Sequence, residues 1–232
     1  MTLGIAREGS AVASAKGAMT YEWGESCDAW TVDQHYKLMI GRTDSKTIDV
    51  EDKLATWESK DGLRYRFDHQ ATSNGAAAPE IKGSAQLDGP DKDGTASFEA
   101  PSLQTIKLQS GALFPSAHAL MLIQSAQAGS HFLLRRVFDG TQAASAPQVT
   151  ATIGPKIDPD PEVVKGNPLL KQPGWHVWLV FLPPDEKIEK PSYELDMLML
   201  ENGISREITV DYGSYTIAAK LDHIEALPKP KC

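Results

Sequence analysis

Apolar and polar residues alternate with a period of two along most of this chain. In segment 30–40 the apolar residues fall on one side of the pattern: Trp30, Val32, Tyr36, Leu38 and Ile40. The polar residues between them, such as Thr31 and Lys37, fall on the other side. Successive side chains of a β-strand point to opposite faces, so this pattern predicts a strand with one face directed at a core.

Turn signals separate several of these segments. Asp61-Gly62 lies between segments 54–59 and 63–71, and Asn202-Gly203 lies between segments 193–200 and 204–212. Both dipeptides are typical of type I′ hairpin turns. Gly213-Ser214 then leads into segment 215–227, so the last three segments predict an antiparallel meander.

The remaining chain predicts more strands of similar length, at 18–23, 80–87, 95–100, 131–138, 148–153 and 175–182. Many short strands punctuated by Gly and Pro are typical of a large antiparallel sheet that curls into an open barrel. The Pro-rich, charged stretch 155–173 is too long for a tight turn and predicts an irregular surface loop. We see no repeat and no domain boundary, so we expect one all-β domain over residues 1–232.

One segment breaks the two-residue pattern. Residues 115–128 are rich in Ala, Leu and Met, begin at Pro115 and are followed by Gly129. Pro at the start and Gly just past the end favour a helix. The predicted helix is apolar over much of its circumference, so we expect it to be buried on the concave side of the sheet.

Segment 175–182 is apolar on both faces of its predicted strand. It is either a central strand covered on both sides or a strand whose inner face lines an apolar cavity. We expect the helix to pack near this strand and, if it fills the concavity only partly, to leave a cavity. The candidate cavity-lining residues come from the helix and this strand: Leu120, Leu122, Ile123, Trp175, Trp178 and Phe181.

The charge and hydropathy of the chain limit the kinds of partner that it can bind. The net charge of −8 argues against nucleic acid and against anionic membrane surfaces. No apolar run is long enough for a transmembrane helix. The residues after Met1 do not form a signal peptide, so an exported protein would be represented here by its mature part behind an added Met1.

The search for catalytic motifs is negative: the sequence has no nucleophile elbow, phosphate loop, dinucleotide fingerprint or metal-ligand spacing. His118 and the Asp68-His69 pair are better explained as structural residues, and Asp88–Gly94 as a hairpin turn instead of a calcium loop. We therefore predict a protein that is not an enzyme and that uses no metal or cofactor.

The two cysteines are Cys27 and Cys232, which stand 205 residues apart. They are either a disulfide that ties the C-terminus to the first strands or two unrelated thiols. A disulfide would indicate an oxidising compartment.

Several segments stand out along the chain: Met19–Thr31, Leu113–His118, Val137–Gly140, Met199–Ser205 with Asp211–Gly213, and the terminal Cys232. Taken together, they resemble the EipB-type cell-envelope-integrity family of Gram-negative bacteria. The resemblance implies a periplasmic protein with a strongly curved antiparallel sheet (a β-spiral), an associated helix and a disulfide between Cys27 and Cys232. It implies a role in envelope integrity and supplies no active site.

Two functions therefore compete. The first is a non-enzymatic periplasmic module that supports the envelope by binding a protein partner. The second is a carrier of lipids or lipoproteins in an apolar concavity. A hydrolase ranks well behind both. The sequence specifies neither the ligand nor the oligomeric state.

Overall fold

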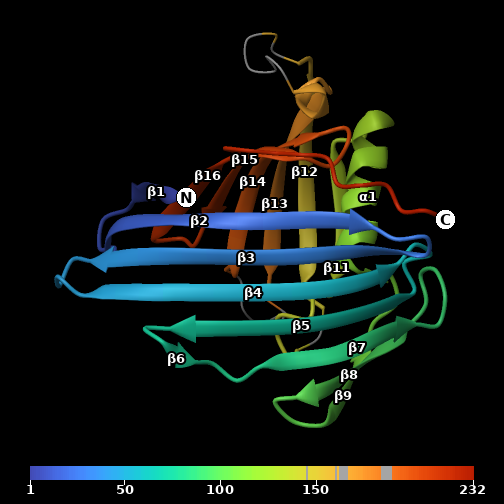
Figure 1. Cartoon of the computed structure of the whole chain (residues 1–232), viewed down its shortest axis with the longest axis horizontal. Coiled ribbons are helices and arrows are strands. Elements are labelled where there is room, and N and C mark those ends of the chain that lie inside the picture. Colours follow the sequence, from blue (N-terminus) through green and yellow to red (C-terminus); the bar gives the residue numbers. More distant parts are fainter. Residues whose placement is uncertain (145, 160, 162–166, 184–189) are drawn as a thin grey trace.

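A computed structural model describes residues 1–144, 146–159, 161, 167–183 and 190–232. The described residues form one 16-stranded sheet and one α-helix (Figure 1). The first half contains β1 (Thr2–Ala6), β2 (Val12–Glu25), β3 (Ala29–Arg42), β4 (Thr47–Ser59), β5 (Arg64–Ser73), β6 (Ala76–Ala77), β7 (Ile81–Leu87), β8 (Gly94–Ala100), β9 (Gln104–Leu108) and β10 (Ala112–Leu113). The second half contains α1 (Pro115–Gln127), β11 (Phe132–Val137), β12 (Gln148–Ile157), the 3-10 turn η1 (Pro168–Leu170), β13 (Gly174–Leu182), β14 (Tyr193–Leu200), β15 (Ser205–Asp211) and β16 (Tyr215–Lys220).

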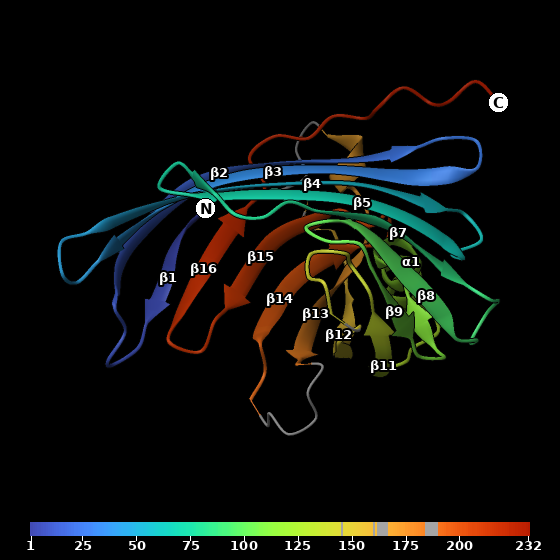
Figure 2. The same cartoon turned by 90° about the horizontal axis from the view of Figure 1, so that it is seen from below.

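The sheet curls until its two edges approach each other. Its order is β10-β11-β12-β13-β14-β15-β16-β1-β2-β3-β4-β5-β7-β8-β9, with β6 attached to β5. In Figure 2 the long strands β2–β5 form one wall and β11–β16 form the other. All pairs are antiparallel except β10–β11, so the sheet is mixed. The predicted all-β, strongly curved sheet with one principal helix is confirmed.

Helix α1 lies on the concave side of the sheet, where it packs against β11 and β12 (Figures 1 and 2). Its buried residues Leu122, Ile123 and Ala126 join a core cluster with the inner residues of β11–β14, including Val149 and Val177. The prediction that the helix packs on the concave face near β13 is confirmed.

A second core cluster closes the seam between the edge strands. Tyr65, Phe67, Phe114 and Phe138 pack there with ring centroids between 5.0 and 6.4 Å apart. The edge strands β9 and β10 contribute Leu108 and Ala112 to the same cluster, so side chains close the barrel where no backbone pairing does.

Three details of the sequence prediction are corrected. The turns at Gly62 and Gly203 each hold only the glycine at positive φ, whereas a type I′ turn requires positive φ at both central residues. The last strand ends at Lys220, before the predicted residue 227. Strand β12 extends to Ile157, so the stretch 155–173 begins inside the sheet, and residues 160 and 162–166 of it lie outside the described part.

The structure joins Cys27 to Cys232 in a disulfide, with 5.6 Å between the Cα atoms. Cys27 lies in the turn between β2 and β3, and residues 221–232 continue without a strand from β16 to that turn (Figure 1). The disulfide therefore fixes the C-terminal tail to one end of the β2–β3 hairpin.

Candidate functional site: the concave face of the sheet

The concave face of β2, β3 and β4 is apolar but incompletely packed. Strand pairing places Met19 opposite Tyr36, and Tyr21 opposite Gln34, on the inner side. Eight apolar inner residues of these strands are only half-buried or exposed, and neither core cluster contains them: Met19, Tyr21, Val32, Tyr36, Leu38, Ile40, Val50 and Leu54. Solvent therefore reaches an apolar surface inside the curved sheet.

Tyr21 shows this combination of enclosure and access. Its side chain is 54% exposed, yet burial among protein atoms, together with the charge of Glu58, raises the pKa of Tyr21 to about 12. Tyr21 therefore lies on the inner face of β2 with part of its side chain open to solvent. Its neighbour on the same face, Met19, is 37% exposed.

A row of four aromatic rings crosses the opposite wall. Phe181 on β13 stacks on Tyr193 at 4.3 Å between ring centroids, and Tyr193 is followed by Tyr212 at 6.4 Å. Tyr215 on β16 continues the row at 5.2 Å from Tyr212. Phe181 and Tyr193 are directly paired on neighbouring strands, where cross-strand aromatic pairs stabilise a sheet. Tyr212 directly follows the end of β15, and its backbone N–H donates to the carbonyl of Tyr215.

Tyr36 faces this row from the β2–β5 wall. Burial raises its pKa, and Asp52, Tyr212 and Tyr215 raise it further, so these groups lie within electrostatic range of one another. Beside it, His69 Nε2 donates to Asp52 Oδ2 at 2.7 Å, and this bond raises the pKa of His69. The inner surface is thus mainly apolar and aromatic, and its polar groups include tyrosine hydroxyls, Gln34 and the Asp52–His69 pair.

The residues predicted from the sequence to line a cavity do not stay together. Leu122, Ile123 and Trp175 are packed into the core between α1 and the sheet. Leu120 is half-buried and outside both clusters, and Phe181 begins the aromatic row.

Trp178 departs furthest from the expectation. It projects from the outer face of β13, where it is 46% exposed and its indole N–H donates to Glu194 Oε2 at 3.0 Å. The reason is the two-residue alternation of β13: Trp175 and Phe181 are an even number of residues apart, whereas Trp178 is an odd number from both.

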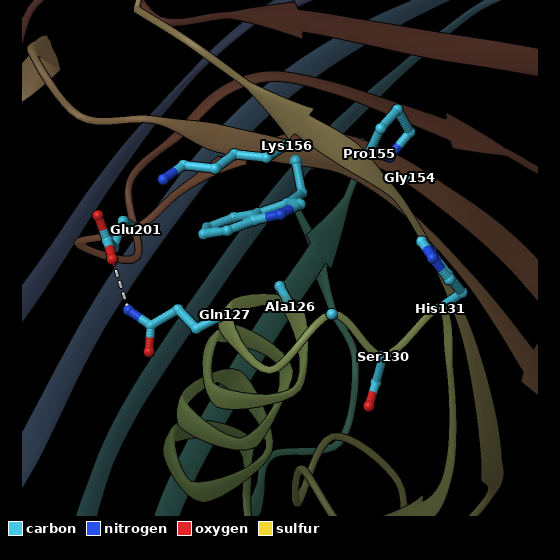
Figure 3. A pocket seen from close by; sticks show the side chains of 10 residues that line it. Ala126, Gln127, Ser130, His131, Gly154, Pro155, Lys156 and Glu201 are labelled. Carbon is cyan, nitrogen blue, oxygen red and sulfur yellow. Dashed lines mark hydrogen bonds between the residues drawn. The ribbon is translucent and has the colours of Figure 1, made fainter.

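A cavity of about 430 Å³ lies where α1 ends (Figure 3). Trp175 and Lys156 border it from the sheet, and Gln127 Nε2 donates to Glu201 Oε1 across it at 2.6 Å. His131 Nδ1 donates to the carbonyl of Ile153 at 3.0 Å. The pairing of β12 with β13 shifts between Ile153 and Lys156, and this irregularity lies directly at the cavity.

The described residues offer no recognisable catalytic constellation. Among them, no serine, threonine or cysteine side chain is hydrogen-bonded to a histidine ring, and no group of three His, Cys, Asp or Glu could hold a metal. His118 is buried on α1 against Arg135, and desolvation followed by the charge of Arg135 lowers its pKa to about 4. A neutral, enclosed histidine of this kind is structural.

Sequence reasoning missed most of the concave surface. A usable signal was present: Met19 and Tyr21 alternate with the polar Thr20 and Glu22, as the inner and outer residues of one strand should. What the sequence did not specify was which residues face each other across the concavity, such as Tyr36 of β3 and Tyr212.

Fold and site together define a nearly closed, barrel-like sheet with an internal helix, a disulfide to its C-terminal end and an accessible apolar interior. No helix in the described ranges is long and apolar enough to cross a membrane. The chain belongs to the EipB-like family, whose model matches residues 1–228. The family resemblance seen in the sequence is confirmed.

Individual relatives agree with this assignment. The chain is 27% identical over 225 residues to the cell envelope integrity protein EipB of Brucella abortus (strain 2308), covering 95% of this chain and 79% of that protein. Its fold matches the crystal structure of a beta-barrel-like protein of domain of unknown function DUF1849 from Brucella abortus. That match has a TM-score of 0.86 and 26% identity, over 95% of this chain and 92% of the other.

Proposed function

We propose that this protein supports the integrity of the cell envelope from the periplasm as a non-enzymatic binding protein, and that its ligand is an acyl chain of a lipid or lipoprotein held on the concave face. The name of its Brucella relative supports the envelope role. The disulfide supports an oxidising compartment.

The main observation in support of an acyl ligand is the exposed apolar surface inside the sheet. Folding normally removes such side chains from water, because burial contributes about 25 cal/mol per Å² of apolar area. Met19 and Tyr21 instead remain accessible on an enclosed face. An acyl chain can cover these side chains without requiring hydrogen bonds from them, and the tyrosine hydroxyls and the Asp52–His69 pair offer contacts for a polar head group.

Strand β2 provides a matched test. Met19→Lys and Tyr21→Lys place a charge on the inner face, whereas Thr20→Lys and Glu22→Lys place one on the outer face of the same strand. With the fluorescent fatty acid cis-parinaric acid as probe, the inner variants should bind roughly tenfold more weakly and the outer variants should bind as the parent does. Equal effects from both pairs, at unchanged melting temperature, would contradict the proposal.

Material bound in the cell gives a second readout. Protein purified from a periplasmic extract without detergent should carry acyl species that native mass spectrometry detects, and Tyr21→Lys should carry less. Protein that is free of such species and also fails to bind cis-parinaric acid would exclude the carrier function.

A second candidate function is the binding of a protein partner in the same compartment. It is favoured by large apolar side chains that are exposed on the outer face of the sheet, away from the acyl site.

A further inference from the structure

Large apolar side chains gather on the outer face of β11–β13. Phe132 and Leu134 on β11 are 60% and 43% exposed, and Trp178 on β13 is 46% exposed. Strand pairing puts Phe132 and Trp178 in one row, joined through Thr152, and Leu134 and Val180 in the next row, joined through Thr150. These four apolar residues, here called the outer patch, are close neighbours on one surface.

An acidic hollow continues the outer patch across β14 and β15. It has a volume of about 250 Å³, and Trp178 forms the side that it shares with the outer patch. Its acidic residues are Glu194, Asp196 and Asp211. Arg7 donates two hydrogen bonds to Asp211, at 2.8 and 2.6 Å, and the charge of Glu194 also acts on Arg7.

The two remaining carboxylates lie beside the apolar surface. Glu194 accepts the indole N–H of Trp178 at one oxygen, and strand pairing places it directly opposite Val180. Asp196 is directly opposite Trp178 and makes its only ion pair among the described residues with His176, at 3.7 Å. Apolar contact area and the carboxylates of Glu194 and Asp196 therefore adjoin on one face.

We propose that this face docks a segment of a partner protein in which aromatic or aliphatic side chains stand next to lysine or arginine. The apolar side chains of that segment would cover the outer patch, and its cation would enter the hollow between Glu194 and Asp196. Such a pairing buries apolar area and matches charge at its edge, as protein interfaces do. The inference deepens the second candidate function and does not depend on acyl binding, which uses the opposite face of the sheet.

Two other occupants fit this surface less well. An anionic membrane would be repelled by the two carboxylates and by the net charge of −8. In a symmetric contact between two copies of this chain, the same acidic hollow would be present on both sides of the interface.

The test uses three fluorescein-labelled twelve-residue peptides and fluorescence anisotropy. The first peptide alternates Lys with Phe and Leu, the second has Glu in place of Lys, and the third has Ser in place of Phe and Leu. The folded protein should bind the first peptide saturably, and the other two at least about fivefold more weakly. Equal binding of the first and third peptides would indicate simple attraction to an acidic protein and would overturn the proposal.

Charge-matched variants locate the binding surface. Glu194→Lys with Asp196→Lys changes the hollow, and Glu22→Lys with Asp33→Lys changes the protein's charge equally on the outer face of β2 and β3. The first pair should abolish binding of the Lys-containing peptide, and the second pair should lower it only slightly. Trp178→Ser should also weaken binding by about tenfold if the outer patch contributes apolar contact.

Two results would reject this surface. One is an equal loss of binding in both charge-matched pairs. The other is a concentration-dependent dimer in sedimentation experiments that Trp178→Ser dissociates, since this would make a second copy the occupant. Binding of cis-parinaric acid, measured on the same preparations, reports separately on the concave face, so the two proposals can fail independently.

Discussion

Glu58, at the end of β4, caps the N-terminus of α1 from another part of the fold: its carboxylate accepts the backbone N–H of Ser116 at 2.7 Å. The second carboxylate oxygen accepts the N–H of Ala117, also at 2.7 Å. Phe114, the residue before the helix, has no side-chain oxygen with which to cap it. A buried carboxylate at a helix N-terminus satisfies free N–H groups and interacts favourably with the helix dipole.

Replacement of Glu58 should therefore loosen α1. Burial raises the pKa of Glu58, while the hydrogen bonds from Ser116 and Ala117 lower it. These hydrogen bonds therefore favour the charged form of the Glu58 carboxylate. We expect Glu58→Ala to cost about 1–3 kcal/mol in the free energy of unfolding, because two N–H groups lose their acceptor. Denaturant unfolding measures the loss, and hydrogen exchange should speed up in the first turn of α1. The exposed Glu22→Ala is the control.

Leu122 should behave as a core residue. Its side chain is 2% exposed and packs between α1 and the sheet. We expect Leu122→Ala to cost about 2–5 kcal/mol. Leu120→Ala, at a half-buried position outside both core clusters, should cost clearly less. Equal costs, or a negligible cost at Leu122 with weaker binding of cis-parinaric acid, would mean that Leu122 lines a cavity.

Reduction of the disulfide should lower the melting temperature. The bond closes a loop of 205 residues, for which the chain-entropy model gives a stabilisation of about 5 kcal/mol at most. For a protein of this size, that corresponds to a shift on the order of 10 °C. Calorimetry with and without reductant measures it, and the double variant Cys27→Ser, Cys232→Ser should not respond to reductant. Two reactive thiols in the native oxidised protein would refute the pairing.

His118 should make the fold sensitive to acid. Its pKa is about 4 in the folded protein, compared with an ordinary value of 6.5, so the unfolded chain binds the proton more readily. Stability linked to His118 is therefore complete above about pH 6.5 and is lost as the pH falls toward 4. His118→Gln should remove on the order of 3 kcal/mol of this pH dependence. The measurement is urea unfolding of both proteins between pH 4 and 7. Parallel pH profiles would show that His118 does not titrate in this range.

His69 should change the stability of the fold with pH in the direction opposite to His118. Its bond to Asp52 raises its pKa, so the stability that it contributes is complete below pH 6.5 and is lost as the pH rises through the folded value. The His118 comparison therefore uses paired profiles of parent and variant, in which the contribution of His69 cancels.

Local patterns in the sequence determined the elements of this protein. The alternation at Trp30–Ile40 became the inner and outer faces of β3, and Pro115 and Gly129 marked the beginning and end of α1. Both features depend on residues close together in the chain, where backbone geometry alone connects sequence to structure. The family resemblance added the pairing of Cys27 with Cys232, which no local pattern specifies.

The tertiary structure decided which surfaces these elements share. Alternation along β13 puts Trp178 and Phe181 on opposite faces, and the packing of α1 on one of these faces decided that Phe181 is inside and Trp178 outside. Sheet curvature brought Tyr36 opposite Tyr212, and the cap from Glu58 held α1 on the concave face. These relationships join residues far apart in the chain. They follow from the twist and register summed over the whole sheet, which no short segment of sequence contains.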